Sequence, residues 1–330
     1  MIPLHKRLTT KAVLRSLLGL FLVAVVGLTA WHFPRKTDAV ATRDISDADY
    51  LAFYEKSYAP STSSATPDHS GEPTAGPRVR RSYEIESCSP GAADNPVIER
   101  IREFVQKYGL QHKRILEVGA GSGYLQDVVE DYTGLDISST AARFFHKPFV
   151  QASATNLPFP DSSFDVVWTI TVLEHVPKPE QALLEMRRVV KDGGYIYLEP
   201  AWQCRTWAAE GYAARPYSDF DLKGKIIKAS IPIRDSVIFR SLYIFPIRLL
   251  RASYAVITGT PTAFRYNELS PNYKYYWVPD GDAVNSMDGF EAMLWFGTRG
   301  DEILNYPSAV RRFFFRHGAV IIRVRKGRSG

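Results

Sequence analysis

Three glycines at alternate positions, Gly119, Gly121 and Gly123, follow an apolar run that ends in the acid Glu117. The apolar run predicts a buried strand, the glycines a tight turn, and Tyr124 the start of a helix. Glycines let the backbone come close to a ligand, and the N-terminus of a helix offers free N–H groups. The G-x-G-x-G spacing departs from the G-x-G-x-x-G of dinucleotide sites, so the turn alone does not identify the ligand.

A second carboxylate, Asp136, ends the next apolar run, which extends from Tyr132 to Leu135. An acid about 20 residues beyond such a turn can accept hydrogen bonds from the hydroxyl groups of a ribose. The two strand-end acids and the glycine turn between them therefore predict a site for a ligand that contains a ribose.

Four further motifs follow in order: Leu157-Pro158-Phe159, Phe164-Asp165-Val166-Val167, Leu173-Glu174-His175-Val176 and Gly193-Gly194. Together with the glycine turn, they resemble the class I S-adenosylmethionine-dependent methyltransferases, in the type 11-like subgroup with LPF…FDVV…LEHV…GG motifs. The resemblance extends from about Asn95 to Pro200. It implies a methyltransferase that uses S-adenosylmethionine as its cofactor. The glycine turn contains no Lys, which suits a cationic sulfonium and argues against a P-loop.

The resemblance also implies which residues contact the cofactor. Glu117 would contact its methionine part, Asp136 would hold the ribose hydroxyls, and Ile137 would pack on the adenine. Gly119, Gly121 and Gly123 would let the backbone approach, and further contacts are expected from Ser153, Ala154 and Thr169.

Ser153 departs from the subgroup, which usually has an acid there to bind the adenine amino group. A hydroxyl would make that hydrogen bond weaker by about 1 kcal/mol. The substitution leaves open the alternative of a catalytically inactive methyltransferase-like scaffold.

Two side chains are candidates for the proton acceptor of the reaction. His175 follows the fourth predicted strand, and an imidazole titrates near neutral pH; in the subgroup this histidine is also partly a structural signature. Glu199 follows the fifth strand and is a second candidate base or a substrate ligand, with a carboxylate of no catalytic role as the alternative. No metal is expected, because the acids of Asp280-Gly281-Asp282 lack the glycine that a calcium loop needs.

Apolar strands alternate with helical segments, which predicts an α/β fold with a mostly parallel sheet covered on both faces. The resemblance implies a Rossmann-like, doubly wound sheet of seven strands with an antiparallel last strand. The predicted strands are 114–118, 132–136, 149–152, 164–169, 195–199 and 319–325. The predicted helices are one capped by Asn95 and closed by Gly109, and 124–130, 139–146, 179–190 and 288–299.

Outside this core, the sequence predicts a membrane-anchored protein. Residues 1–11 are basic, and 12–33 contain an uncharged apolar run long enough to cross a bilayer, with a cleaved signal peptide as the alternative. Residues 34–93 are expected to form a linker, with a short helix within 44–58 and a flexible tether from 59 to 78. The methyltransferase core would comprise 94–200 and 288–330, and 201–287 would be an insertion after the fifth strand.

The insertion alternates basic and apolar residues, which is typical of a segment on an anionic membrane surface or of a lid. We therefore expect an acceptor near the membrane, such as a lipid-linked glycan, a polyprenyl intermediate or another small molecule, methylated at an oxygen. Positive charge before the apolar run slightly exceeds that after it, which weakly favours a catalytic domain outside the cytoplasm. Because the cofactor is made in the cytosol, the catalytic domain is nevertheless expected to face the cytoplasm. The net charge of +6 is too small to indicate a nucleic-acid partner. A nicotinamide-dependent oxidoreductase is disfavoured by the glycine spacing and the LPF and LEHV motifs.

Overall fold

The computed structural model describes residues 10–41, 43, 48–59, 95–275 and 277–327. Its centre is a seven-stranded sheet in the order β3-β2-β1-β4-β5-β9-β8. Strands β1 to β5 are mutually parallel, and β9 pairs antiparallel with both β5 and β8. The strands are β1 (Ile115–Val118), β2 (Tyr132–Asp136), β3 (Phe149–Gln151), β4 (Phe164–Ile170), β5 (Val190–Glu199), β8 (Glu302–Ile303) and β9 (Val320–Arg323). The predicted doubly wound sheet with an antiparallel last strand is confirmed.

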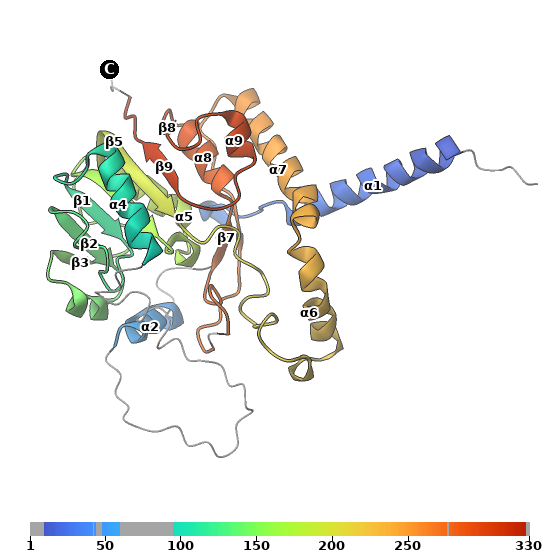
Figure 1. Cartoon of the computed structure of the whole chain (residues 1–330), viewed down its shortest axis with the longest axis horizontal. Coiled ribbons are helices and arrows are strands. Elements are labelled where there is room, and N and C mark those ends of the chain that lie inside the picture. The colour runs from blue at the N-terminus through green and yellow to red at the C-terminus, as the bar shows by residue number, and fades with distance from the viewer. Residues whose placement is uncertain (1–9, 42, 44–47, 60–94, 276, 328–330) are drawn as a thin grey trace, which may run out of the picture.

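Helices cover both faces of the sheet (Figure 1). On one face lies α4 (Pro96–Tyr108), which begins at the predicted cap: the Asn95 side chain accepts a hydrogen bond from the Val97 amide, and Gly109 ends the helix in the left-handed conformation. The other face carries α5 (Pro179–Val189) and α8 (Gly289–Gly297). Two buried apolar clusters, one on each side of the sheet, form the core.

Two predicted helices next to the glycine turn differ from the structure. Residues 124–130 form turns and bends, and the 139–146 segment is a 3-10 helix, η2 (Ser139–Phe144). The Gln126 side chain explains the first difference in part, because its amide donates to the Phe144 carbonyl and accepts from the His146 amide. Side-chain bonds to η2 and the β-branched pair Val128-Val129 both compete with helix formation over so short a segment.

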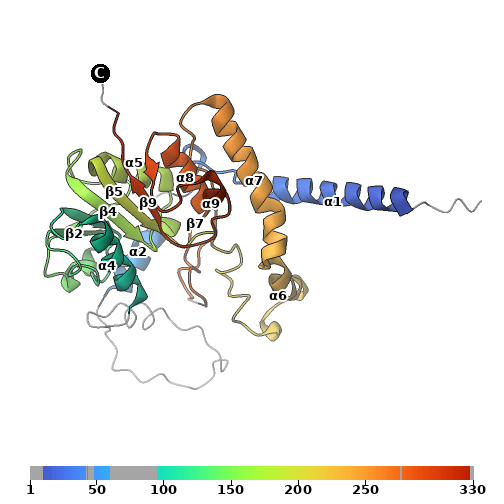
Figure 2. The same ribbon diagram turned by 45° about the horizontal axis from the view of Figure 1, so that its top comes forward.

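The insertion after β5 contains two long helices, α6 (Leu222–Arg234) and α7 (Val237–Thr258), and the hairpin of β6 (Tyr266–Glu268) and β7 (Asn285–Met287). Short elements complete the described chain: η1 (Asp38–Val40), η3 (Leu173–His175), η4 (Tyr217–Asp219) and α9 (Ala309–Phe313). Figures 1 and 2 show α6 and α7 following one another along the side of the molecule opposite β3.

The N-terminal part of the described chain contains α1 (Thr10–His32) and α2 (Ala48–Ser57). The C-terminal end of α1 rests on α7, where the His32 ring stacks on Tyr243 at 4.0 Å, and the rest of α1 projects away from the domain (Figure 2). By length and composition, Leu14–His32 could cross a membrane, with a mean hydropathy of 1.9. Most of the predicted tether, 59–78, lies outside the described residues.

Two ion pairs join the insertion to the core. Arg251 of α7 binds both oxygens of Glu291 in α8, with the closest atoms 2.5 Å apart, and Arg248 binds Asp288, the residue that caps α8. The Arg251 and Glu291 side chains are only 6% and 5% exposed. The position of α7 on the core therefore depends on a buried charge pair.

Replacing Arg251 alone should lower the stability strongly. Arg251→Met leaves the Glu291 carboxylate buried without its partner, and we expect a loss of about 3–5 kcal/mol in the free energy of unfolding. The double variant Arg251→Met with Glu291→Met should recover most of that loss. Arg102→Met, in an exposed pair with Glu99, is the control and should change stability by less than about 1 kcal/mol. Denaturant unfolding in detergent measures all three, and equal losses in the single and double variants would contradict the argument.

Candidate functional site

The glycine turn lies between β1 and the bends that precede β2. Gly119, Gly121 and Gly123 have φ values of 75°, 51° and 70°, a region that residues with a Cβ rarely adopt. A Cβ on Gly119 would lie 2.2 Å from a methyl carbon of Val172. The amides of Gly119 and Ala120 donate to the Leu135 carbonyl, which ties the turn to the end of β2. The turn therefore needs glycine for both its conformation and its close packing.

Glu117 lies near the end of β1, and its carboxylate is buried. The Tyr132 hydroxyl donates to its Oε2 at 2.5 Å. Burial raises the pKa of Glu117 to about 8, and the Tyr132 hydrogen bond offsets that rise only in part. A carboxylate held in this way would be stabilised by a nearby cation, such as a sulfonium or an ammonium group.

Asp136 ends β2 on the other side of the turn. Its Oδ2 accepts from the Gly121 amide at 2.9 Å, and its Oδ1 accepts from the Ser138 amide at 3.0 Å. Burial raises the pKa of Asp136, and these backbone hydrogen bonds oppose the rise. The structure thus brings Glu117, the glycines and Asp136 together, and this donor set fits the charged and hydroxyl-bearing parts of S-adenosylmethionine.

The other predicted cofactor residues occupy the neighbouring strand ends. Ile137 directly follows Asp136 and is half-buried, and Ala154 is buried after β3. The Ser153 hydroxyl is engaged locally, because it accepts from the Thr155 amide at 3.1 Å and contacts the Thr155 hydroxyl at 2.8 Å. Thr169 in β4 is buried, and its hydroxyl has no hydrogen-bond partner among the described residues.

Helix α2 covers this edge of the sheet, a feature that sequence reasoning missed. Both oxygens of Glu55 accept hydrogen bonds from the start of η2, including the Ser139 amide at 2.8 Å and the Thr140 amide at 3.2 Å. These bonds lower the pKa of Glu55 even though burial opposes them. Tyr58, just beyond α2, places its hydroxyl 3.0 Å from where a Cβ of Gly121 would be. A carboxylate is favoured at the N-terminus of a helix, but Glu55 and η2 are 84 residues apart, so the sequence around either one does not predict their contact.

His175 lies in η3, after β4, beside two carboxylates. Its Nδ1 is 3.4 Å from Asp282 Oδ2, and its Nε2 is 3.8 Å from Glu174 Oε1. Tyr54 of α2 donates to Asp282 at 3.3 Å and its ring packs edge-on against His175. Asp282 comes from the insertion, so two segments more than 100 residues apart meet at His175. The sequence singled out His175 and the 280–282 loop separately but not their contact.

Glu199 does not join this group of side chains. Its carboxylate binds Arg100 of α4 at 2.9 Å and accepts from the Tyr197 hydroxyl at 2.7 Å. These contacts favour a structural role for Glu199 in attaching α4 to β5.

Glu117→Gln should change how stability depends on pH. Folding raises the pKa of Glu117 from 4.5 to about 8, so the stabilisation from its protonation is complete below pH 4.5 and is lost as the pH rises through 8. An amide carries no charge, so the melting temperature of the variant relative to the wild type should rise between pH 5 and pH 9. Thermal unfolding of the ligand-free chain in detergent measures this difference. The control is Glu103→Gln at an exposed position, whose melting temperature relative to the wild type should not change with pH. The same pH-independence for Glu117→Gln would refute the assignment.

Comparisons with known proteins identify the family of the chain. Residues 116–198 match the family model described as a methyltransferase domain. The chain is 32% identical over 173 residues to a probable phthiotriol/phenolphthiotriol dimycocerosates methyltransferase 2 of Mycobacterium ulcerans, covering 46% of this chain and 67% of that protein. It is 37% identical over 100 residues to a fatty-acid O-methyltransferase of Mycolicibacterium smegmatis, covering 26% of this chain and 36% of that protein.

Among solved structures, an S-adenosylmethionine-bound amino pentose methyltransferase of Micromonospora echinaspora, CalS10, is 17% identical with a TM-score of 0.32, over 36% of this chain and 56% of that chain. The chain therefore belongs to the class I S-adenosylmethionine-dependent methyltransferases.

Proposed function

We propose that this methyltransferase is anchored in a membrane by α1 and methylates a hydroxyl group of an amphiphilic, lipid-type acceptor. The observation that carries the proposal is the dual role of the insertion. The same segment presents a long apolar surface and supplies Asp282 to the side chains around His175. The relatives named for lipid and fatty-acid substrates support this acceptor class.

The apolar surface lies on α6 and α7, next to the end of α1. Its members are large aliphatic side chains that are 52–83% exposed: Leu222, Ile226, Ile233, Val237, Ile238, Leu249, Leu250, Val256 and Ile257. Both views show α1 leaving the domain crosswise to α6 and α7 (Figures 1 and 2). If α1 crosses the bilayer, the two insertion helices lie along the membrane surface, as amphipathic interfacial helices do.

The basic residues of the insertion contribute less to this surface than their number in the sequence suggests. Arg248 and Arg251 are buried in ion pairs with α8, and the Lys228 ammonium group donates to the Tyr212 carbonyl. Lys223 and Lys225 remain exposed near the start of α6. The proposed membrane contact is therefore mainly apolar, with a small electrostatic part.

The insertion also connects this surface to the candidate site. The Gln203 amide donates to Met287 in β7 at 2.8 Å, and the Val284 amide donates to the Glu174 carbonyl at 2.9 Å. Helix α6 is tied to the same segment, because Arg205 binds Asp235 at 2.6 Å. An acceptor whose apolar part stays in the membrane could thus present its polar end to the residues around His175.

The proposed reaction transfers the methyl group from the sulfonium to the acceptor oxygen. The products are a methyl ether or ester, S-adenosylhomocysteine and the proton of the hydroxyl. Glu117 and Asp136 would hold the cofactor, and the glycine turn would lie against its methionine part. Helix α2, which covers η2 and the glycine turn, would exclude water from the cofactor. We propose that the catalytic domain faces the cytoplasm, where the cofactor is made.

Cofactor binding should depend on Asp136. Asp136→Ala removes both acceptors proposed for the ribose hydroxyls, and we expect S-adenosylmethionine affinity to fall at least about 30-fold, as for two lost hydrogen bonds to a charged group. Calorimetric titration of the full chain in detergent, with the cofactor and with S-adenosylhomocysteine, measures this. Asp127→Asn, an exposed acid just beyond the same turn, is the control and should bind like the wild type. Absence of binding to the folded wild type would instead favour the inactive scaffold.

Membrane association should survive loss of α1 and then depend on α7. Deleting residues 1–31 keeps His32 and Lys36, which contact Tyr243 and Glu268. We expect this shortened chain to bind phospholipid vesicles and to remain largely bound in high salt, because the contact is mainly apolar. Adding Val256→Ser and Ile257→Ser should reduce vesicle binding several-fold, whereas Leu184→Ser on α5 should not.

Co-sedimentation with vesicles measures the bound fraction, and cofactor titration confirms that each variant is folded. Complete release of the shortened, cofactor-binding chain into the soluble fraction would contradict the proposed surface.

A further inference from the structure

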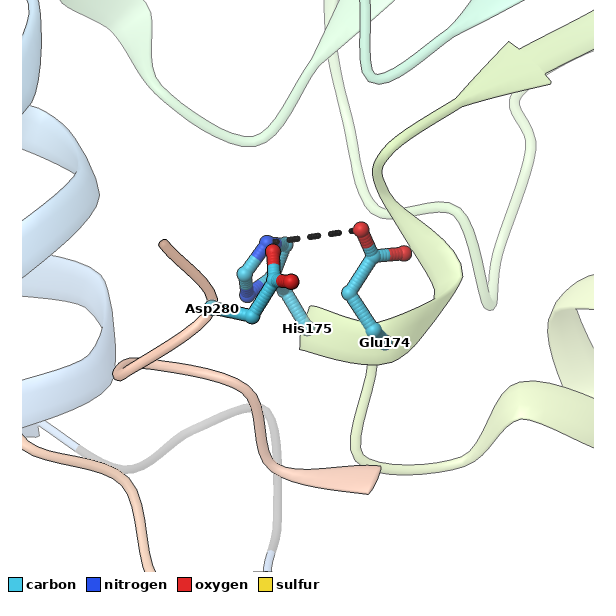
Figure 3. A group of neighbouring side chains, drawn as sticks. All are labelled: Glu174, His175 and Asp280. Carbon is cyan, nitrogen blue, oxygen red and sulfur yellow. Dashed lines mark ion pairs between the residues drawn. The ribbon is translucent and has the colours of Figure 1, made fainter. Parts of the chain in front are cut away.

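Three metal-ligating side chains converge beside the candidate site (Figure 3). Glu174 and His175 are adjacent in η3, and Asp280 reaches them from the loop that precedes β7. One ligand atom from each lies within 4.8 Å of the others, and His175 Nε2 is 3.8 Å from Glu174 Oε1. Ligand atoms around a bound first-row metal ion lie about 3–4 Å apart, so only small side-chain rotations would close the group.

Glu174 is the least explained polar group of this part of the protein. Its side chain is fully buried, and neither carboxylate oxygen has a hydrogen-bond partner among the described residues. Burying a carboxylate costs several kcal/mol unless it is paired, protonated or bound to a metal. Figure 3 shows the Glu174 carboxylate directed toward His175 and Asp280, so the missing partner would lie between these three side chains.

A further carboxylate lies beside this group, and the Arg205 guanidinium is also near. Asp282 lies on the far side of the His175 ring, with its Oδ2 3.4 Å from Nδ1. Burial raises the pKa of the neighbouring Cys204 thiol, and the charges of Glu174, Asp280 and Asp282 add to the rise. Such a concentration of carboxylates would attract a divalent cation.

The arrangement around His175 matches the outer contacts of metal-bound imidazoles. A metal-ligating histidine commonly directs its other ring nitrogen at a carboxylate, which fixes the ring and its tautomer. Here Nδ1 faces Asp282, and Tyr54 donates to that same carboxylate at 3.3 Å. Such support places the Nε2 lone pair on the side of Glu174.

We propose that Glu174, His175 and Asp280 bind one divalent first-row transition-metal ion, through a carboxylate oxygen of each acid and Nε2 of the histidine. Two carboxylates and one imidazole suit Mn²⁺, Fe²⁺ or Zn²⁺ better than Mg²⁺ or Ca²⁺, which prefer oxygen ligands throughout. Two carboxylates also balance the charge of the ion. The loop spacing around Asp280 gave no metal signal in the sequence, because two of the three ligands come from a segment more than 100 residues earlier.

This inference deepens the proposed function and rests on it for the role of the ion. The three ligands follow β4 at the ligand-binding edge of the sheet and leave coordination positions for an acceptor oxygen. A metal ion lowers the pKa of a bound hydroxyl and orients it, so the ion would do what the sequence assigned to His175 as a base.

Metal binding can be measured without activity. The full chain in detergent, freed of metals with a chelator, would be titrated with Mn²⁺ and the free ion followed by its paramagnetic resonance signal. A separate calorimetric titration would use Zn²⁺. We expect saturable binding of one ion per chain for at least one of the two metals.

Glu174→Gln and Asp280→Asn should each weaken this binding at least tenfold, and Asp282→Asn should weaken it about 10–100-fold through the orientation of His175. The matched control is Glu130→Gln, which alters an exposed His–Glu pair, His112 and Glu130, with ring and carboxylate atoms 2.8 Å apart. That variant should bind like the wild type. S-adenosylmethionine titration reports whether each variant is folded and separates failure of the metal site from failure of the cofactor site.

The proposal would be overturned if neither metal binds the cofactor-binding wild type with saturation. Binding that Glu174→Gln and Asp280→Asn leave unchanged would also overturn it, since the ion would then lie elsewhere. If Glu174→Gln fails to fold, Asp280→Asn on its loop and the wild-type titrations decide the outcome. A wild type that binds metal but no S-adenosylmethionine would support the metal site and refute the proposed function.

Discussion

The site is governed by the cost of keeping carboxylates away from water. Glu117, Asp136 and Glu174 are all buried at the carboxyl ends of neighbouring parallel strands. Each is stabilised differently: Glu117 by a tyrosine hydroxyl, Asp136 by backbone amides, and Glu174 chiefly by the adjacent imidazole. The sheet thus holds a set of buried acids whose ionised forms are stabilised when cationic or hydroxyl-bearing groups bind, as the groups of a sulfonium cofactor would.

The same logic explains the position of the insertion. Ligands bind at the carboxyl ends of the strands in an open α/β sheet. Here the chain between β5 and α8 brings two further acids, Asp280 and Asp282, to that edge. Its attachment to the core is itself ionic, through Arg251 with Glu291 and Arg248 with Asp288. Such pairs contribute directionality rather than much net stability, so they fix the position of α7 while its outer face remains apolar. The insertion can therefore lie on a membrane and still present polar groups to the site.

Local patterns predicted most of the core. The strands from β1 to β5, the caps of α4, and the acids at 117 and 136 depend on hydrophobic runs and on residue types at fixed offsets, which a single sequence contains. The helix expected at 124–130 was wrong because side-chain bonds from Gln126 compete with helical ones. The contacts of Glu55 with η2 and of Asp282 with His175 join segments 84 and more than 100 residues apart. No local periodicity encodes such pairs, so the residues that surround the strand-end acids could not be predicted from the sequence.

Helix α2 gives the protein a property that its catalytic residues alone would not. It covers the cofactor side through Glu55, while the chain before it is attached to the insertion, where Lys36 pairs with Tyr266 and with Glu268. The helix is held by Glu55 at the start of η2 and by Tyr54 against Asp282 and His175, contacts that are fewer than those within the sheet, so its local opening would cost less than unfolding of the sheet. Exchange of spent for fresh cofactor would then proceed by local opening of α2. If α1 anchors the protein as proposed, this exchange would not require the protein to leave the membrane.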